Sequence, residues 1–307
     1  GCSKLSSVNY PLNLKSKSDS SSNYSPFYNC PKLTSIVIPE GITEIPADMF
    51  KGMTSLRSIK LPESLESIGY EAFEECTGLP TVIIPDAVKT IDSYAFNGCT
   101  GLTTIVLPPE LKTVWYSVFG GCTGLESVVL PEGLQTLGYY AFGGCTSLES
   151  IHIPDSVTTI ERGAFCGCRG LTELTLPEGV TAIEEYTFSE CDALTKVTIS
   201  EGVTVIGNHA FSACYGLTEI TIPESVTTIE EAAFSGCSVL TEITIPDGVT
   251  TIEDWAFAWC TSLKTVHIPA SVTSIGNDMF YATENAVIDA PEGSYAYEWA
   301  KANNRLA

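Results

Sequence analysis

A repeat of 23 residues runs through almost the whole sequence and constrains the fold more than any other feature. Residues 217–237 read LTEITIPESVTTIEEAAFSGC, and the same unit starts again at Leu240. All 12 phenylalanines obey this spacing, from Phe27 to Phe280. Such a period without insertions is typical of a solenoid, in which each repeat buries its apolar side against its neighbours.

Each repeat has the same internal order. The pattern L-x-x-L-x-L, as at Leu217, Ile220 and Ile222, predicts a short strand with its apolar residues inward. Proline at the seventh position ends the strand, because it has no N–H for the ladder. The later Ala-Phe pair predicts a short helical turn on the opposite side, with the phenylalanine rings stacked. Where the chain bends into the next strand, at Gly101 for example, we expect a positive φ.

The column I-P-[ED]-x-[VL]-x-x-I-x-x-x-A-F-x-x-C, as in residues 153–168, resembles the BspA-like leucine-rich repeats of bacterial surface proteins. The resemblance covers about Phe27 to Pro291. It implies a right-handed α/β repeat solenoid, with short strands on the concave face and short helical turns opposite. We divide the chain into an N-terminal tether or cap (1–26), a leucine-rich repeat domain (27–291) and a C-terminal capping helix (292–307).

Both ends of the sequence depart from the repeat. The first 26 residues are rich in serine and lysine, but some apolar residues there recur at strand spacing, which predicts a cap on the first repeat. These residues are Leu5, Val8, Tyr10, Leu12 and Leu14. At the other end Ser294 predicts a helix N-cap, and Tyr295, Trp299 and Ala302 share one helical face. Trp299 is expected to plug the last repeat.

Cys2 resembles the acylated cysteine of a bacterial lipoprotein, although a cysteine at an arbitrary position explains it equally. The charge balance argues against two other kinds of partner. The chain has 15 Lys and Arg against 37 Asp and Glu, which disfavours nucleic acid and direct adsorption to anionic lipid. We therefore expect membrane association only through a lipid at Cys2, no nucleic-acid partner and no cofactor.

Cysteine is frequent, but its spacing argues against disulfides. Nine cysteines follow one another without a gap in one column of the repeat, from Cys76 to Cys260, and Met53 and Thr283 take the same position. Stacked equivalents would have Cβ atoms ~4.8 Å apart with parallel side chains, whereas a disulfide needs ~3.8 Å. We expect free buried thiols. A metal ladder is the alternative, but no Cys-x-x-Cys pair supports it, so we assign no metal site.

Residues that vary at outward positions are the candidates for recognition. The third and fifth positions of each strand face outward, and in the N-terminal half the fifth position is apolar in three successive repeats, at Ile83, Val106 and Val129. Contiguous exposed apolar groups often mark interaction sites, although β-branched residues also favour strands in general. The candidate concave patch comprises Val37, Ile83, Val106, Val129 and His152.

A second group of candidates is aromatic and follows the inner isoleucine of several repeats. Aromatic rows stack on sugar rings or anchor a protein partner; the alternative is that they only cover the seams between repeats. The candidate aromatic row comprises Tyr94, Trp115, Tyr116, Tyr139 and Tyr140.

The sequence offers little support for catalysis. It contains 3 histidines. Of these, His152 and His267 lie five repeats apart, ~24 Å by strand spacing, too far for one site. We name no catalytic residue. The resemblance implies a non-enzymatic cell-surface or secreted binding protein that mediates adhesion to a host matrix or cell-surface protein, or to a bacterial envelope component. The alternative is a glycan-binding accessory protein that uses the aromatic row.

Overall fold

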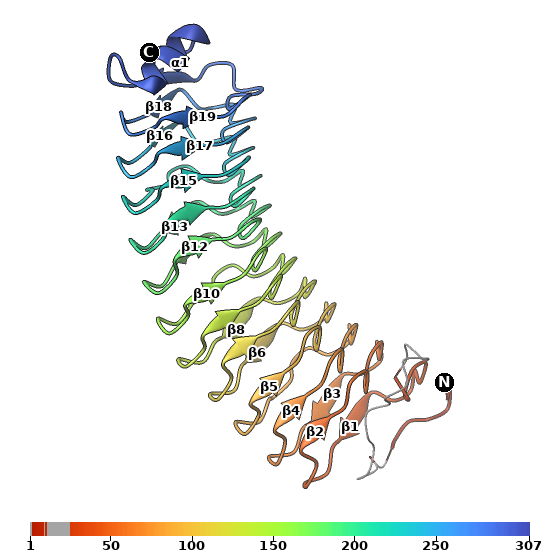
Figure 1. Cartoon of the computed structure of the whole chain (residues 1–307). Helices are drawn as coiled ribbons and strands as arrows, with labels where there is room; N and C mark the ends of the chain where they lie inside the picture. The colour runs from red at the N-terminus through yellow and green to blue at the C-terminus, as the bar shows by residue number, and fades with distance from the viewer. Residues whose placement is uncertain (1, 9, 11–24) are drawn as a thin grey trace. The chain divides into compact units, whose positions relative to one another are not determined.

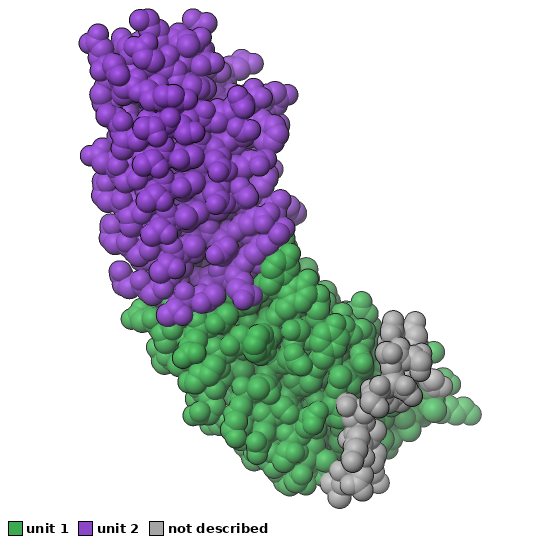
Figure 2. All heavy atoms as spheres, viewed as in Figure 1, with its two compact units in different colours: residues 1–157 green, residues 158–307 purple. Residues whose placement is uncertain are grey.

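The computed structural model describes residues 2–8, 10 and 25–307. The chain divides into two compact units, residues 1–157 and residues 158–307, which Figure 2 shows in different colours. Each unit is a β-solenoid built from the 23-residue repeat (Figure 1), and each is described by itself below.

The first set of strands comes from the L-x-x-L-x-L pattern, and its outward side is called the strand face here. Partners pair in parallel at a register of 23 residues, as Val106 with Val129 and Thr175 with Thr198. In β20 the step falls to 22 residues, because one residue is deleted before Val287. The strands of unit 1 are β1 (Ser35–Val37), β3 (Ser58–Lys60), β6 (Thr104–Val106) and β8 (Ser127–Val129). Those of unit 2 are β11 (Glu173–Thr175), β13 (Lys196–Thr198), β16 (Glu242–Thr244), β18 (Thr265–His267) and β20 (Val287–Asp289).

A second set of strands, which the sequence reading treated only as a return segment, lies after the proline turn. Each has two residues, an outer one and a buried aliphatic one, such as Thr113 and Val114. In unit 1 they are β2 (Glu44–Ile45), β4 (Ser67–Ile68), β5 (Thr90–Ile91), β7 (Thr113–Val114) and β9 (Thr136–Leu137). In unit 2 they are β10 (Thr159–Ile160), β12 (Ala182–Ile183), β14 (Val205–Ile206), β15 (Thr228–Ile229), β17 (Thr251–Ile252) and β19 (Ser274–Ile275).

The prediction of short helical turns at the Ala-Phe pairs, on the side opposite the strands, is wrong. In a representative repeat, Tyr94 and Gly98 have φ values of 60° and 68°, in the left-handed region, which no α-helix permits. Alternate N–H groups of this segment also form hydrogen bonds with the next repeat instead of within their own. Those of Tyr94 and Phe96 donate to the carbonyls of Tyr116 and Val118, at 2.9 and 3.0 Å. A helix needs these donors for its own i→i−4 bonds. The segment that holds the Ala-Phe pair, residues 92–98 in this repeat, is called the corner here. It forms stacked turns that are hydrogen-bonded from one repeat to the next.

The phenylalanine stack is confirmed in both units. Phe73 and Phe96 have ring centroids 5.0 Å apart with planes at 2°, and Phe211 and Phe234 lie 5.4 Å apart at the same angle. These rings are completely buried. Each unit therefore has a continuous aromatic spine in its core, as the period predicted.

The expectation of positive φ at the glycines before each strand is also wrong. Gly101 is not in the left-handed region; a Cβ there would lie 2.3 Å from the Thr77 carbonyl oxygen. A Cβ added at Gly124 would likewise lie 2.4 Å from the Thr100 carbonyl oxygen. Gly101 and Gly124 let the neighbouring backbones approach closely, whereas most of the left-handed glycines, such as Gly98 and Gly121, lie at the corner.

At the N-terminal end, Tyr10 is buried, and its ring centroid lies 6.3 Å from that of Phe50. Leu5 and Val8 are half-buried. Leu12 and Leu14, which belong to the same expectation, lie outside the described residues.

At the C-terminal end, α1 (Tyr295–Ala302) packs against β19 and β20 (Figure 1). Ser294 caps it by accepting from the Tyr297 N–H at 3.2 Å, as predicted. The prediction that the helix buries the face of Tyr295 and Trp299 is wrong in part. Ala296 and Ala300 are buried, whereas Tyr295 is exposed. Small side chains let the helix approach closely, and Trp299 stays half-buried beside Phe280.

In the described part of the chain, no helix has the length and apolar character needed to cross a bilayer.

Candidate functional site

The strand face of unit 1 carries an exposed apolar group, called the strand-face patch here. Ile83, Val106 and Val129 belong to three successive repeats, and 83%, 62% and 53% of their respective surfaces are exposed. Val106 and Val129 are register partners in β6 and β8. The inward residues between them, such as Ile105, are buried, so the strand alternation itself presents the patch to solvent.

The two other predicted members of the patch stand apart from its centre. Val37 is 58% exposed, but its register partner in β3 is Lys60, which separates it from the repeat of Ile83. His152 is exposed in the repeat after Val129, in a segment without regular strand structure. The structure therefore brings Ile83, Val106 and Val129 together and leaves Val37 and His152 at the margins.

The aromatic row lies on the corner of unit 1 and is more continuous than its sequence positions indicate. Tyr94 contacts Tyr116 with ring centroids 4.7 Å apart, Tyr116 contacts Tyr139 at 4.9 Å, and Tyr139 contacts Tyr140 at 4.6 Å. Tyr70, which the row did not include, extends it, 5.7 Å from Tyr94. The rings therefore join four repeats.

Exposure differs along this row. Trp115 and Tyr116 are 50% and 37% exposed, whereas Tyr94, Tyr139 and Tyr140 are half-buried. Burial, with a hydrogen bond to Tyr116, raises the pKa of Tyr94 above its ordinary value. Contact between rings uses part of their surface, so Trp115 offers the most accessible ring of the row.

A half-buried ionic cluster borders the aromatic row at Tyr70. Lys51 forms ion pairs with Glu71 and Glu74, the second at 2.5 Å between Nζ and Oε2. A hydrogen bond to Glu71, together with burial, raises the pKa of Tyr70 to about 12. Lys51 offsets part of the negative charge of the two glutamates, and the raised pKa keeps Tyr70 in its neutral form, which is a structural role.

The cysteine column is confirmed as free buried thiols, and the structure adds a role that the spacing did not show. The Cys99 Sγ donates to the Phe73 carbonyl oxygen at 3.1 Å, and the Cys214 Sγ donates to that of Phe188 at the same distance. Thr283 occupies the same position and donates to the Phe257 carbonyl at 2.8 Å. Burial raises the pKa of Cys122 to about 12, so the thiols remain protonated donors.

The strand face of unit 2 holds an ionic group that the sequence reading missed. The ring nitrogens of His267 lie 2.9 Å from Glu242 Oε1 and 2.8 Å from Asp289 Oδ2. Partial burial lowers the pKa of His267, but hydrogen bonds to the two carboxylates outweigh it and leave the pKa raised. The register predicts Glu242 near His267 on adjacent strands; the deletion before β20 concealed Asp289.

Other candidate chemistry is limited within the described residues. They contain no group of three or more His, Cys, Asp and Glu side chains arranged to hold a metal ion. Cys2 is exposed, and its N–H lies 3.4 Å from the Cys30 Sγ.

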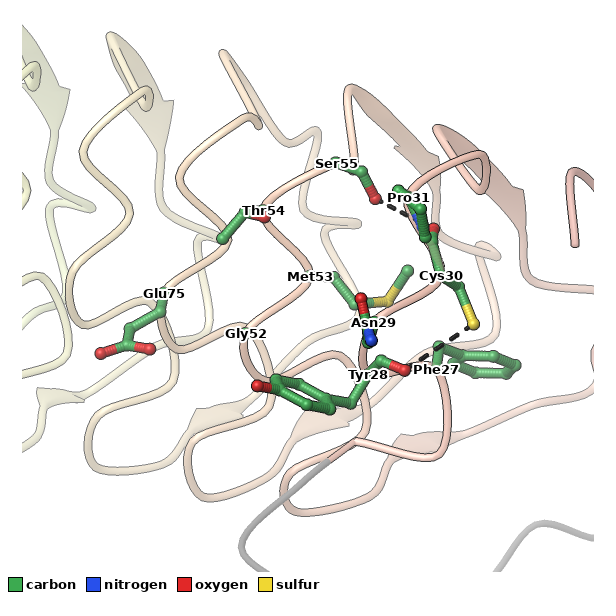
Figure 3. Close-up of a pocket in the computed structure, with 10 residues that line it drawn as sticks. All are labelled: Phe27, Tyr28, Asn29, Cys30, Pro31, Gly52, Met53, Thr54, Ser55 and Glu75. Carbon is green, nitrogen blue, oxygen red and sulfur yellow. Dashed lines mark hydrogen bonds between the residues drawn. The ribbon is translucent and has the colours of Figure 1, made fainter. Parts of the chain in front are cut away.

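A shallow pocket of about 310 Å³ lies near the N-terminal end of unit 1 (Figure 3). Hydrogen bonds in its lining stay within the fold, as from Ser55 Oγ to the Cys30 carbonyl at 3.2 Å. It includes no residue of the strand-face patch or the aromatic row. Its lining residues are Phe27, Tyr28, Asn29, Cys30, Pro31, Gly52, Met53, Thr54, Ser55 and Glu75.

These ladders, the aromatic spine and the exposed strand face define a β-solenoid of the leucine-rich-repeat class. The family model described as "BspA type Leucine rich repeat region (6 copies)" matches residues 21–146, 114–241 and 227–298. The chain belongs to this BspA-type leucine-rich repeat family.

Solved structures of bacterial proteins resemble the chain over most of its length. A leucine-rich cell surface protein from Faecalibacterium prausnitzii is 32% identical, with a TM-score of 0.59 over 87% of this chain and 81% of that one. A leucine-rich repeat protein from Bacteroides ovatus is 28% identical, with a TM-score of 0.60 over 87% and 80%. The pneumococcal vaccine antigen PcpA, 21% identical with a TM-score of 0.57 over 86% and 79%, shares the fold. No curated protein matches the sequence.

Proposed function

We propose that this protein is a non-enzymatic binding protein of the bacterial surface or the secreted fraction, and that the strand-face patch captures a protein partner. The observation that carries the proposal is the exposure of Ile83, Val106 and Val129 on successive repeats. Strand propensity accounts for single β-branched residues on such a surface, whereas contiguous exposed apolar groups with a polar rim are typical of interaction sites.

The rim supports a protein partner. The third-position residues beside the patch, Thr104 and Ser127, are exposed hydroxyl side chains, so a polar border surrounds an apolar centre, as in protein interfaces. The partner classes we propose are a host matrix or cell-surface protein, or a component of the bacterial envelope. The net charge of −22 favours a partner with a basic or neutral surface over an anionic one.

The location forms part of the same proposal. The similar protein from Faecalibacterium prausnitzii is described as a cell surface protein, which supports a surface location here. We propose acylation of Cys2 as the anchor. Incorporation of a clickable palmitate analogue into the expressed full-length protein, abolished by Cys2→Ser, is the expected result; equal labelling of the variant would contradict the anchor.

The direct test of the binding proposal is a double substitution in the strand-face patch. The protein is immobilised and used to capture partners from host matrix and bacterial envelope extracts. Burying an aliphatic side chain contributes about 1.5–3 kcal/mol, so Ile83→Lys with Val129→Lys should weaken capture by at least about 100-fold. Intact capture by the double variant would remove the patch from the proposal.

A matched control comes from the same positions in unit 2. Thr175 and Thr221 are exposed, occupy the fifth position of their repeats and lie two repeats apart, as Ile83 and Val129 do. Thr175→Lys with Thr221→Lys adds the same charge to the same kind of strand. It should leave capture unchanged, so an equal loss in both variants would indicate a general charge effect.

The aromatic row supports a second candidate function, glycan binding. The observation in its favour is Trp115, which is half exposed beside a run of tyrosines in ring contact; such rings are suited to stacking on sugars. A glycan array should then give hits that disappear in Trp115→Ala with Tyr139→Ala. Hits that survive this double change would leave the tyrosines as a cover for the repeat seams.

A further inference from the structure

A pocket of about 320 Å³ lies at the C-terminal end of unit 2, between the corner of the last repeat and α1. It is separate from the strand-face patch and the aromatic row, both of which belong to unit 1. Its lining combines aromatic rings with planar polar side chains, and its volume lies at the lower end of the range typical of small-ligand sites. The lining residues used below are Asp278, Phe280, Tyr281, Trp299, Asn303 and Arg305.

The aromatic walls are fixed by ring contacts and remain accessible. Tyr281 is 53% exposed, and its ring meets that of Trp259 edge to face, with centroids 5.1 Å apart and planes at 71°. Trp299 is half-buried and packs edge to face on Phe280, 6.5 Å between centroids. An edge-to-face contact covers at most one face of a ring, so ring area remains for a ligand on Tyr281 and Trp299.

The polar lining has hydrogen-bonding capacity that the fold does not use. Arg305 donates through Nη1 to the carbonyls of Thr283, Glu284 and Ala286, at 2.8, 2.9 and 3.1 Å. Within the described residues these are its hydrogen bonds, so Nη2 and Nε remain available to an acceptor. Asn303 donates through Nδ2 to the Trp299 carbonyl at 2.8 Å, which leaves its Oδ1 as an acceptor.

The backbone beside the pocket has the left-handed conformation that recurs in every repeat. Trp259 has φ 55°, and the equivalent residues Ala213 and Gly236 are also left-handed. Asp278 has φ 51°, as Trp255 has 56° one repeat earlier. The repeat geometry therefore sets these two backbone positions, and from its position Trp259 contacts Tyr281.

We propose that this pocket binds one ring of a neutral carbohydrate, with Tyr281 and Trp299 against the sugar face and Asp278, Asn303 and Arg305 hydrogen-bonded to its hydroxyls. Hydroxyl groups both donate and accept, and this set offers a carboxylate, an amide oxygen and guanidinium N–H groups. The carboxylate of Asp278 offsets the guanidinium, and the net charge of −22 disfavours an anionic ligand. The polar lining disfavours a purely apolar one.

The test uses the full chain on an array of neutral gluco-, manno- and galacto-oligosaccharides, with sialylated and sulfated glycans for comparison. We expect at least one neutral class to bind, with affinity reduced 10-fold or more by Tyr281→Ala and by Asp278→Asn. Asp278→Asn retains a residue that tolerates a positive φ. Tyr215 is 51% exposed in the same unit, so Tyr215→Ala is the matched control and should bind as the unchanged protein does.

A spectroscopic readout follows the site directly. In the protein with 15N-labelled indoles, the bound sugar should shift the Trp299 indole resonance, assigned by its loss in Trp299→Phe. The proposal is overturned if no neutral glycan binds, if only anionic glycans bind, or if binding persists in both pocket variants. Binding that is lost only in Trp115→Ala with Tyr139→Ala would assign the sugar to the aromatic row and also overturn the pocket.

Discussion

In unit 1 the fifth position of successive strand segments holds Ile83, Val106 and Val129, and in unit 2 the equivalent position holds threonine from residue 175 to residue 244. The backbone registers are the same, at 23 residues. Beside the threonines, the third position holds three glutamates and one lysine (Glu173, Lys196, Glu219 and Glu242), whereas unit 1 has serine and threonine there. One scaffold therefore presents an apolar strand face in unit 1 and an acidic, hydroxyl-rich one in unit 2.

The difference teaches that the inward and outward positions of the repeat are under separate constraints. Inward residues in both units keep their apolar character, and the phenylalanines their identity, because a change must fit the repeats above and below. Outward residues are constrained only by strand propensity and solubility, so they are free to differ. Recognition is therefore expected where the outward positions differ between the units.

The largest expected effect is a loss of stability in the aromatic spine, and it tests whether the cores of the two units are equivalent. Phe96→Ala in unit 1 and Phe211→Ala in unit 2 each remove a completely buried ring, which costs about 3–5 kcal/mol of unfolding free energy. Urea denaturation of the full chain should give losses within ~1 kcal/mol of each other, because both rings are completely buried and stacked on their neighbours, so the same cavity cost applies. A large loss in one variant and a negligible loss in the other would show that the two cores are not equivalent.

A smaller loss of stability, equal in the two units, is expected when the thiol hydrogen bonds of the cysteine column are removed. Cys99→Val and Cys214→Val keep a small apolar side chain, slightly larger than the thiol, but remove the donor to Phe73 and Phe188. Each phenylalanine carbonyl also accepts a backbone N–H, from Cys76 or Cys191, so the loss should be about 1 kcal/mol. Thermal unfolding measures it.

The control for these hydrogen bonds follows from Thr283, which donates from the same position. Cys99→Thr and Cys214→Thr retain a donor of similar size and should restore most of the loss. Valine variants as stable as the unchanged protein would show that the column selects size alone.

The smallest expected effect is a pH-dependent stabilisation by His267, which lies on the strand face of unit 2. The pKa of His267 is raised by Glu242 and Asp289, so its stabilisation is complete below the unfolded pKa near 6.5 and is lost as pH rises through the folded pKa. The melting temperature of the unchanged protein minus that of His267→Gln should therefore be larger at pH 6 than at pH 9. The side chain is 35% exposed, so the change should be a small one. An unchanged or reversed difference would contradict the ion pairs.

The sequence predicted the parts of the structure that repeat in register. The phenylalanine stack, the inward aliphatic residues and the free cysteines all follow from identical residues 23 apart. The strand-face residues Ile83, Val106 and Val129 are exposed as predicted, because strand alternation places every second residue outward. Their role in binding stays a prediction.

The remaining features could not be predicted because they depend on backbone geometry or on breaks in the register. Nothing in Tyr94 or Trp255 signals a left-handed conformation, and without it Ala-Phe reads as a helical turn. The deletion before β20 hid the contact of Asp289 with His267. The terminal Leu306, which bridges to Ile288, and Arg305, which donates to carbonyls of the last repeat, come after a helix that seemed to end the fold.

Hydrogen–deuterium exchange of the full chain, with and without the partner captured from the extracts, tests the central claim most directly. If the apolar outward residues of unit 1 form the binding surface, the partner should slow exchange in the strand segments from Thr81 to Val129 and leave those from Glu173 to Asp289 unchanged. Slowed exchange confined to Glu173–Asp289 would contradict the account, because binding would then use the acidic face.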